Sequence, residues 1–513
     1  MNVLLVYPRF PDTFWSFKHA LRFIRKAAFG PPLGLLTVAA MLPREWPKRL
    51  VDLNVTDLRP ADLEWADMAM VSGMGIQRES AREVIARCKA AGLTVVAGGP
   101  LFTEEYEKFG QVDHFVLDEG ELTLPRFLAD LERGTPQRVY RADGFADMRQ
   151  SPVPLWELAD MPRYASMAVQ FSRGCPFDCE FCNITALLGR VPRTKSAEQV
   201  VAELDRLYGL GWRGSVFFVD DNLIGDRRAA KNELLPALIE WRKDKVGVTF
   251  STQVSINLAD DEELLRQMVE AGFTTVFIGI ETPCEESLSE AHKAQNLRRD
   301  LLESVRRIQR AGMHVEGGFI VGFDSDTPSI FRRQMEFIQQ SGIAAAMVGL
   351  LQAPYGTRLY ERLKREGRLA GEPSGNNVVD FTNIIPKMGL EVLKDGYRGL
   401  LKYIYSPAAY YERVRTFLKE YRPPRLRVHL DGETILAFFR SVYQLGIRGA
   451  ERVHYWRLLL WTLLRRPRSF PMAVTLAIYG FHFRRVCEEQ VLRATQSLAQ
   501  VAKGRPALNP GEM

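Results

Sequence analysis

The first 145 residues alternate short apolar runs with amphipathic stretches, a pattern that predicts strands separated by helices. The predicted strands are residues 3–7, 50–53, 68–72, 94–97 and 114–117. Residues 32–42 and 80–91 have helical spacing and lie between them. Because strands and helices that alternate in this way build a parallel sheet with helices on both faces, we predict a doubly wound α/β domain over residues 1–145.

A proline-containing linker at residues 146–166 separates this domain from a second series of strands and helices over residues 167–370. The predicted strands of the second series are residues 167–171, 216–219, 249–251, 275–280, 315–321 and 346–351. The predicted helices are residues 196–210, 260–271 and 297–311. Six strand–helix units are too few for a closed eight-stranded barrel.

Residues 371–513 have a helical pattern and a one-sided charge. Between Arg422 and Arg485 there are 12 arginines, no lysines and 3 acidic residues, and two strongly apolar runs occupy residues 455–464 and 470–483. Each run is too short to span a bilayer. Three interpretations remain open: a peripheral contact with anionic lipid, a buried helical pair with arginines on its rim, and nucleic-acid binding, for which no reader motif is present.

The composition is that of an ordinary globular chain. It has 513 residues, of which 46% are hydrophobic and 25% charged, and a net charge of +6. The N-terminus has neither a basic segment nor a cleavage site, so no signal peptide is predicted. Six cysteines in a chain this long do not form a disulfide framework, and three of them are clustered. A reducing, cytoplasmic location is therefore predicted, with membrane association left open.

Three cysteines, Cys175, Cys179 and Cys182, lie within eight residues, directly after a predicted strand. The spacing C-x3-C-x2-C supplies three thiolate ligands, and no fourth cysteine lies nearby. A structural zinc site normally has four protein ligands. A [4Fe-4S] cluster held by three cysteines leaves one iron open for a substrate. The motif therefore favours a [4Fe-4S] cluster over a zinc site or three spare thiols.

This spacing, with an aromatic residue (Phe181) before the third cysteine, resembles the radical S-adenosylmethionine (radical SAM) enzymes. The resemblance implies a partial (β/α)6 barrel over residues 167–370 and a cluster that binds S-adenosylmethionine. Asp220-Asp221-Asn222 replaces the family's Gly-Gly-Glu string, and residues 318–322 resemble its G-x-I-x-G motif. The resemblance implies S-adenosylmethionine contacts from Phe181, Asp220, Asp221, Asn222, Ser255, Asn257, Glu281, Gly318, Ile320 and Gly322. The alternative for Asp220, Asp221 and Glu281 is helix capping.

A Rossmann-like domain placed before such a barrel resembles the cobalamin-binding domain of cobalamin-dependent radical SAM enzymes. The G-x-G-x-x-G fingerprint is missing after the first strand, which disfavours a nicotinamide or flavin cofactor. The implied cobalamin contacts are Pro32, Leu33, Gly34, Ser72, Gly73, Met74, Gln77, Gly98, Gly99, Pro100, Glu119, Gly120, Glu121 and Arg193. A solvated loop is the alternative for Arg193. A sheet domain that has lost its cofactor is the alternative for the whole domain.

The D-x-H-x-x-G string that supplies an axial histidine in better-known cobalamin proteins does not occur. The resemblance therefore implies a cobalt without a histidine on its lower face, with the loop of residues 74–77 covering that face.

The strings at residues 169–175, 218–225, 255–260, 318–325 and 347–351 look like those of the hopanoid C-methylase branch. This resemblance implies methyl transfer from methylcobalamin to an unactivated sp3 carbon of a lipophilic, hopanoid-like substrate after hydrogen abstraction by a 5′-deoxyadenosyl radical. It implies an electron donor such as a ferredoxin or flavodoxin, and no nucleic-acid partner. The alternatives are a non-methylating cyclisation or rearrangement of a lipid or tetrapyrrole, a radical SAM enzyme with a vestigial N-terminal domain, and a non-catalytic membrane adaptor.

Overall fold

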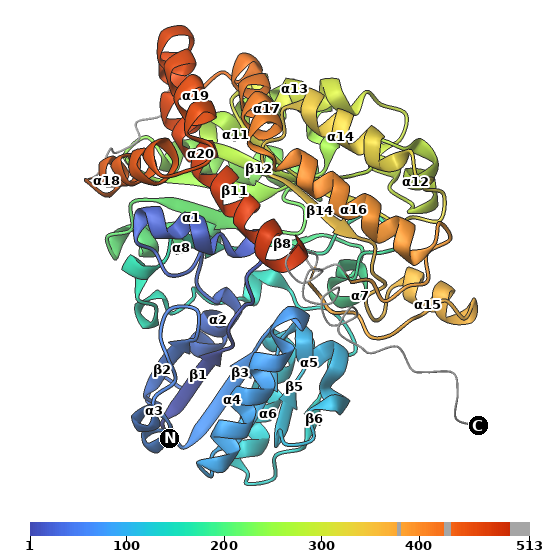
Figure 1. Cartoon of the computed structure of the whole chain (residues 1–513). Coiled ribbons are helices and arrows are strands. Elements are labelled where there is room, and N and C mark those ends of the chain that lie inside the picture. The colour runs from blue at the N-terminus through green and yellow to red at the C-terminus, as the bar shows by residue number, and fades with distance from the viewer. Residues whose placement is uncertain (377–380, 425–431, 493–513) are drawn as a thin grey trace, which may run out of the picture.

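The computed structural model describes residues 1–376, 381–424 and 432–492, and it contains two six-stranded parallel sheets followed by a helical C-terminal region (Figure 1). The strand order of the N-terminal sheet is β2-β1-β3-β4-β5-β6, and all its neighbouring strands run parallel. Its strands are β1 (Val3–Tyr7), β2 (Lys48–Asp52), β3 (Met68–Ser72), β4 (Thr94–Gly98), β5 (His114–Val116) and β6 (Val139–Tyr140).

Both faces of this sheet are buried because its strands are apolar at successive positions. Leu4 and Val6 face one core, which α4 completes with Val84, whereas Val3 and Leu5 face a second core on the opposite side. Helices therefore cover the sheet on both faces, as in a doubly wound domain. They are α2 (Leu33–Met41), α3 (Pro60–Trp65), α4 (Arg78–Ala90), α5 (Pro100–Glu105) and α6 (Gly120–Glu132).

The second sheet has the strand order β14-β13-β12-β11-β10-β7 and is parallel throughout. Its strands are β7 (Ser166–Val169), β10 (Ser215–Phe218), β11 (Thr249–Gln253), β12 (Phe273–Glu281), β13 (His314–Val321) and β14 (Ala346–Leu350). A short antiparallel pair, β8 (Ser172–Arg173) and β9 (Arg193–Thr194), brackets the cysteine loop. The sequence pattern did not predict this pair, because each strand has only two residues.

Helices pack on the outer face of the second sheet, which confirms the predicted strand–helix alternation. They are α8 (Ala197–Gly209), α9 (Arg227–Ala229), α10 (Leu235–Trp241), α11 (Glu262–Ala271), α12 (Glu285–Glu290), α13 (Leu301–Ala311) and α14 (Ile330–Ser341). Ser196 caps α8 as expected, since its side chain accepts a hydrogen bond from the backbone of Gln199. Six strands with outer helices form the partial barrel.

A segment near the N-terminus leaves the first sheet and packs on distant parts of the chain. It consists of η1 (Phe14–Ser16), α1 (Lys18–Leu21) and η2 (Arg22–Ile24), and its apolar residues belong to the barrel core rather than to the N-terminal cores. His482 Nε2 lies 3.0 Å from the carbonyl oxygen of Phe14, and Arg440 Nη1 donates to that of Phe23 at 2.6 Å. This segment therefore joins the two ends of the chain.

The C-terminal region is helical, as predicted. Its helices are α16 (Leu390–Ile404), α17 (Pro407–Glu420), α18 (Gly432–Ser441), α19 (Arg452–Arg465) and α20 (Phe470–Val486). Helix α15 (Arg358–Arg365) comes before them, within the range predicted for the barrel. The π-helical turn η11 (Val442–Ile447) connects α18 to α19. The parts of the predicted region at residues 377–380, 425–431 and 493–513 lie outside the described residues.

The two apolar runs of this region have different surroundings. The run at residues 470–483 lies in α20, most of whose apolar side chains are buried against the barrel core and the N-terminal segment. The run at residues 455–464 lies in α19, which is buried on one face only. Among the helices of the described residues, none is both long enough and apolar enough to cross a bilayer.

Candidate functional site

The cysteine loop follows β7 and β8, and a buried carboxylate holds its beginning in place. Asp220, fully buried at the end of β10, accepts hydrogen bonds from the backbone N–H groups of Ser172 (2.5 Å) and Phe171 (3.1 Å). The Ser172 hydroxyl donates a third, at 2.6 Å. Burial raises the pKa of Asp220 to about 6, and these hydrogen bonds oppose the rise. Asp220 therefore caps the cysteine loop rather than a helix.

Gly174 allows the loop to turn directly before the first cysteine. Its φ of +92° lies in the left-handed region, and a Cβ atom there would lie 2.9 Å from the carbonyl oxygen of Val191. The backbone N–H of Cys175 donates to the carbonyl oxygen of Gly189 at 3.2 Å. The loop thus closes against the segment between α7 (Ile184–Leu188) and β9.

The three cysteines are unpaired and only partly buried, which suits ligands that must meet an inorganic group. Burial raises the pKa of the Cys182 thiol, and the neighbouring thiols of Cys179 and Cys175 raise it further, so the three lie close together. Three clustered thiolates suit a [4Fe-4S] group, in which one iron stays open. The assignment of all three thiolates to the cluster stays a prediction.

A buried lysine that the sequence analysis missed lies beside this loop. Lys293 Nζ forms an ion pair of 2.7 Å with Glu281 Oε1, and both side chains are about nine-tenths buried. Burial lowers the pKa of Lys293, but Glu281 and the thiols of Cys179 and Cys182 outweigh it and raise the pKa above its ordinary value. Lys293 therefore carries a positive charge next to the cluster loop. No motif marks it, because it reaches the site from the turn after α12.

Glu281 ends β12 in a strained backbone conformation. Its φ is +63°, in the left-handed region that a glutamate rarely adopts, and the register with β13 shifts at this point. The bend aims its carboxylate at Lys293 and towards the cysteine loop. Glu281 thus has a partner, Lys293, that sequence reasoning did not supply, and its contact with S-adenosylmethionine stays a prediction.

Other predicted residues meet at the carboxyl ends of β10 and β11. The Ser255 hydroxyl donates to Asn257 Oδ1 at 2.6 Å and receives a hydrogen bond from Asn222 Nδ2 at 3.2 Å. The buried Oδ2 atom of Asp221 has no hydrogen-bond partner in the described structure. Burial, followed by the charge of Asp220, raises the pKa of Asp221 to about 7. A cationic amine beside Asp221 would satisfy the free oxygen and restore the ionised form.

The predicted adenine side of the site lies on β13. Gly318 lies beside the ring of Phe277 on the neighbouring strand β12, and the backbone N–H of Gly322 donates to Asp326 Oδ2 at 2.9 Å. Ile320 and Phe181 both pack against one apolar cluster, in which the Phe181 ring lies 6.0 Å from that of Phe323, two residues after β13. Phe181 is thus brought next to the strand that carries the G-x-I-x-G motif. The structure places these predicted residues together, and their contacts with S-adenosylmethionine stay predictions.

The inner face of the barrel remains accessible to solvent. Along β10, β11, β12 and β13, outward side chains are buried, whereas the inward positions, which include Phe217, Phe277 and Gly318, are only partly buried. Trp15, from the N-terminal segment, lies against Phe277 with a ring separation of 4.7 Å and is 41% exposed. The inward aromatic side chains of the barrel are therefore less buried than the outward ones.

The predicted cobalamin residues gather at the carboxyl edge of the N-terminal sheet, where doubly wound sheets bind ligands. They follow β3 (Ser72, Gly73, Met74, Gln77) and β4 (Gly98, Gly99, Pro100), or begin α2 (Pro32, Leu33, Gly34) and α6 (Glu119, Gly120, Glu121). Gly99 has a φ of +87°, and a Cβ atom there would lie 2.4 Å from Ser72 Oγ. Met74 is half exposed. A small-residue cradle with an exposed apolar side chain fits a large flat cofactor.

The Gln77 side chain is used within its own loop. It is buried, its amide donates to the carbonyl oxygen of Pro8 at 2.5 Å, and its Oε1 accepts from the backbone of Met74 at 2.8 Å. Its amide therefore shapes the loop of residues 74–77. The expected contact of Gln77 with cobalamin, and the covering of the lower face by this loop, stay predictions.

A buried ion-pair cluster lies between the two domains. It contains three of the predicted cobalamin residues, Glu119, Glu121 and Arg193, together with Arg173. Arg173, two residues before the first cysteine, pairs with Glu119 at 3.0 Å and with Glu121 at 2.8 Å. Arg193 pairs with Glu119 at 2.8 Å. Burial raises the pKa of Glu121, but the Arg173 guanidinium outweighs it and lowers the pKa to about 2. The cluster attaches the start of α6 to the two strands that bracket the cysteine loop.

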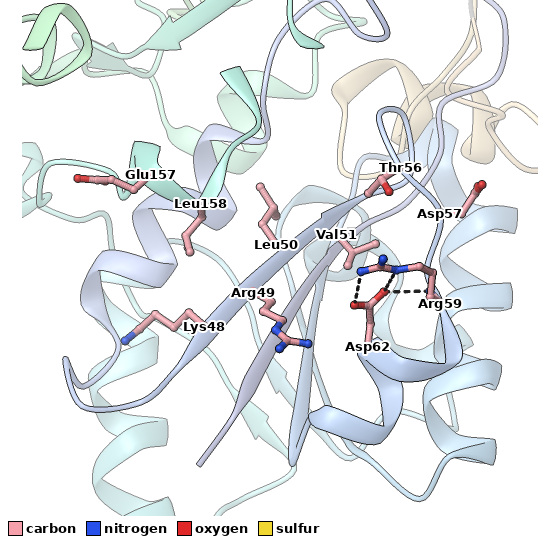
Figure 2. A pocket seen from close by; sticks show the side chains of 10 residues that line it. All are labelled: Lys48, Arg49, Leu50, Val51, Thr56, Asp57, Arg59, Asp62, Glu157 and Leu158. Atoms are coloured by element: carbon pink, nitrogen blue, oxygen red, sulfur yellow. Dashed lines mark hydrogen bonds and ion pairs between the residues drawn. The ribbon is translucent and has the colours of Figure 1, made fainter. Parts of the chain in front are cut away.

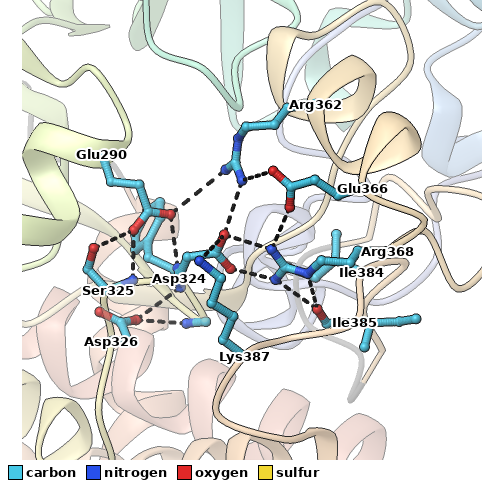
Figure 3. Close-up of polar contacts among 12 residues, drawn as sticks. Glu290, Asp324, Ser325, Asp326, Arg362, Glu366, Arg368, Ile384, Ile385 and Lys387 are labelled. Atoms are coloured by element: carbon cyan, nitrogen blue, oxygen red, sulfur yellow. Dashed lines mark hydrogen bonds and ion pairs between the residues drawn. The ribbon is translucent and has the colours of Figure 1, made fainter.

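Another arginine, Arg362, also fixes the cysteine loop. Arg362 Nε pairs with Glu180, which lies between the second and third cysteines, at 2.7 Å. Figure 3 shows Arg362 and Arg368 converging on Asp324, at 3.0 and 2.5 Å. Because Asp324 follows β13, Arg362 connects the cysteine loop to the strand with the predicted adenine motif. These long-range pairs were not predicted.

A shallow hollow at the outer edge of the N-terminal sheet lies apart from this site. β2 and the turn at residues 157–158 line it, and the Arg59–Asp62 ion pair, at 3.1 Å, borders it (Figure 2). It contains none of the predicted site residues.

Comparisons with known proteins agree with this arrangement. Residues 169–338 match the radical SAM superfamily, residues 24–128 match the B12 binding domain, and residues 357–496 match a domain of unknown function, DUF4070. A hopanoid C-2 methylase from Rhodopseudomonas palustris is 38% identical over 90% of this chain and 90% of its own length. An uncharacterised methyltransferase from Synechocystis sp. is 42% identical over 94% and 91%.

This chain belongs to the cobalamin-dependent radical SAM methyltransferase family. Its cofactors are accordingly a [4Fe-4S] cluster, S-adenosylmethionine and cobalamin. Two solved structures share the fold. The cobalamin-dependent radical SAM enzyme OxsB has a TM-score of 0.60 at 14% identity, covering 99% of this chain and 82% of its own. The methyltransferase TsrM from Kitasatospora setae has a TM-score of 0.57 at 15% identity, covering 95% and 100%.

The inter-domain cluster can be tested with Arg173→Met. Removing the guanidinium leaves Glu119 and Glu121 buried with less compensation, so we expect the free energy of unfolding to fall by about 3–5 kcal/mol. Chemical denaturation followed by fluorescence measures this change. Arg266→Met is the matched control, because Arg266 pairs with Glu263 and Glu270 on the exposed face of α11. Equal effects of the two changes would contradict a coupling role for Arg173.

The buried pair beside the cysteine loop can be tested with Lys293→Met. We expect the Kd for S-adenosylmethionine to rise about tenfold or more, because Glu281 becomes an unpaired buried carboxylate and the site loses a cation. The measurement is anaerobic titration of the reconstituted protein. Lys293→Arg should restore much of the affinity, and Lys231→Met, which removes a more exposed pair with Asp261 at 2.9 Å, should leave it unchanged. An unaltered Kd in Lys293→Met would refute this assignment.

Proposed function

We propose that this enzyme transfers a methyl group to an unactivated sp3 carbon of a lipophilic, hopanoid-like substrate. The observation that carries the proposal is the row of partly exposed aromatic side chains on the inner face of the barrel, which includes Trp15, Phe217 and Phe277. An apolar, rigid substrate gains binding energy from such a wall. The similarity over nine-tenths of the chain to a hopanoid C-2 methylase supports the same substrate class.

The cofactors, when bound, supply a carbon-centred radical and a transferable methyl group, which together modify carbons that lack an acidic proton. The chain's own residues place these groups. Cys175, Cys179 and Cys182 bind the iron, and the loop that bears them is fixed by Asp220. The buried Oδ2 atom of Asp221, which has no hydrogen-bond partner among the described residues, is available to a cationic ligand.

The remaining polar groups orient S-adenosylmethionine. In this proposal, the free Asp221 oxygen accepts from its amine, Lys293 faces its carboxylate, and the pair of Ser255 and Asn257 binds hydroxyl groups. Ile320 and Phe181 present an apolar surface to its adenine. The residues at the carboxyl edge of the N-terminal sheet hold cobalamin on the side of the barrel that carries the cysteine loop. A reduced electron donor and a small-molecule substrate complete the reaction.

Trp15 belongs to this site although it comes from the N-terminal segment. It reaches the inner face of β12 because η1 packs among the C-terminal helices and the barrel. Its ring lies beside Phe277 and is largely accessible, so it is placed to contact an apolar substrate rather than to fill the core.

The test is anaerobic incubation of the reconstituted enzyme with methyl-labelled S-adenosylmethionine, a reductant and a hopanoid-containing lipid extract. We expect label in a lipid, with 5′-deoxyadenosine and S-adenosylhomocysteine both formed. Deoxyadenosine without labelled lipid or S-adenosylhomocysteine would contradict methylation and favour a rearrangement. Trp15→Ala should reduce lipid methylation about tenfold while deoxyadenosine still forms, because the wall loses a large apolar contact. Trp65→Ala, in α3 and distant from the barrel, is the matched control.

A further inference from the structure

The helices α18 and α19 expose an unusual amount of apolar surface. Large apolar side chains on α18, η11 and α19 are between 39% and 79% exposed, and Leu464 is the most exposed of them. We call this surface the outer ridge and define it by Phe439, Tyr443, Ile447, Leu460, Leu463 and Leu464. The helices lie at the end of the molecule opposite the N-terminal sheet (Figure 1).

Helix α19 carries two apolar stripes, of which only one is needed for the fold. Tyr455, Leu458, Leu459 and Thr462 face inwards at helical spacing and are buried. A second stripe at the same spacing lies on the opposite face and is exposed. It consists of Trp456, Leu460, Leu463 and Leu464. An ordinary surface helix has polar residues there. A second apolar stripe that is exposed indicates a binding surface, because contiguous exposed apolar patches commonly mark sites where a protein binds a partner or a membrane.

Cations surround the outer ridge. Arg452, Arg457, Arg465 and Arg468 are exposed, and none of them has an ion-pair partner among the residues that the structure describes. Of the two acidic residues in α18 and α19 or between them, Glu451 is buried and pairs with Arg484, and Glu433 pairs with Arg440 at 3.3 Å. Exposed arginines beside tryptophan and leucine match the chemistry of an anionic lipid surface.

We propose that the outer ridge binds this enzyme peripherally to an anionic lipid bilayer. The apolar side chains enter the boundary between headgroups and acyl chains, and the flanking arginines contact the lipid phosphates. No helix of the described residues crosses the bilayer, so the contact lies in the plane of the interface. A second copy of this chain fits the ridge less well, because a two-fold interface centred on it would bring its unpaired arginines against one another.

This surface is separate from the cofactor site. Helix α18 packs on η2, η11 and α20, and α19 packs on η11, η12, α17 and α20, and these elements contain none of the predicted cofactor residues. The proposal therefore stands or fails without reference to methyl transfer. Lipid binding by an enzyme that methylates nothing would support the outer ridge alone.

The experiment is co-sedimentation of the full-length, cofactor-loaded enzyme with vesicles of phosphatidylcholine, with and without phosphatidylglycerol. We expect binding that needs phosphatidylglycerol and weakens as salt is raised. The double variant Leu463→Glu/Leu464→Glu should lower the partition coefficient about tenfold or more, because it places charges in the apolar contact. Arg457→Gln/Arg465→Gln should lower it to a similar extent on anionic vesicles. Val246→Glu, at an exposed position distant from the ridge, is the matched control.

Three results would overturn the proposal. The first is no vesicle binding by the unaltered enzyme, and the second is binding that the ridge variants leave unchanged. The third is a stable dimer in sedimentation velocity that Leu463→Glu/Leu464→Glu converts to monomer, with no effect on lipid binding. That result would assign the ridge to a second copy of the chain. Circular dichroism and cofactor content, expected to be unchanged in the variants, exclude a folding defect.

Discussion

The position of the cysteine loop depends on buried charged residues that bind it at three points. Asp220 fixes its start by accepting hydrogen bonds from the backbone of residues 171–172. Arg173 attaches it to the N-terminal domain, and Arg362 attaches Glu180 within it to the strand end at Asp324. Buried ion pairs of this kind contribute little net stability, but breaking one is costly. Their effect here is to allow one arrangement of the loop.

This arrangement explains how two separate sheets form one site. Both sheets are parallel, and the predicted ligand-binding residues of each lie in loops at its carboxyl edge. The cluster of Arg173 with Glu119 and Glu121 joins the two edges, so the cobalamin cradle and the cysteine loop are held to each other. The N-terminal segment adds Trp15 to the barrel wall and, through Phe14 and His482, connects the site region to the C-terminal helices.

The sequence predicted what depends on local pattern. Apolar periodicity gave the two sheets, and the spacing of Cys175, Cys179 and Cys182 indicated the cluster loop, because both signals lie within a few neighbouring residues. The pairing of Lys293 with Glu281 joins residues across a loop that has no motif, and that of Arg173 with Glu121 joins separate domains. Such pairs are determined by tertiary packing, so the periodicity of the sequence does not predict them.

Some predicted site residues also have structural partners. Polar atoms of Asp220 and Gln77 bond to backbone groups, and the contacts of both residues with cofactors stay predictions. Fixing the shape of a loop and binding a ligand require the same residue types, so a single sequence does not distinguish these two roles. The C-terminal arginines show the same ambiguity. One apolar run is buried in α20, whereas the other leaves a face of α19 exposed.

Electron paramagnetic resonance of the reduced, reconstituted protein tests the central claim most directly. That claim is that three cysteines hold a [4Fe-4S] cluster with one open iron. We predict about four irons per chain and a signal that changes when S-adenosylmethionine is added. Cys179→Ala should lose both, whereas Cys284→Ala, a buried cysteine outside the loop, should keep them. A Cys179→Ala protein that keeps its iron and its response to S-adenosylmethionine, or a loop that retains zinc, would contradict the account.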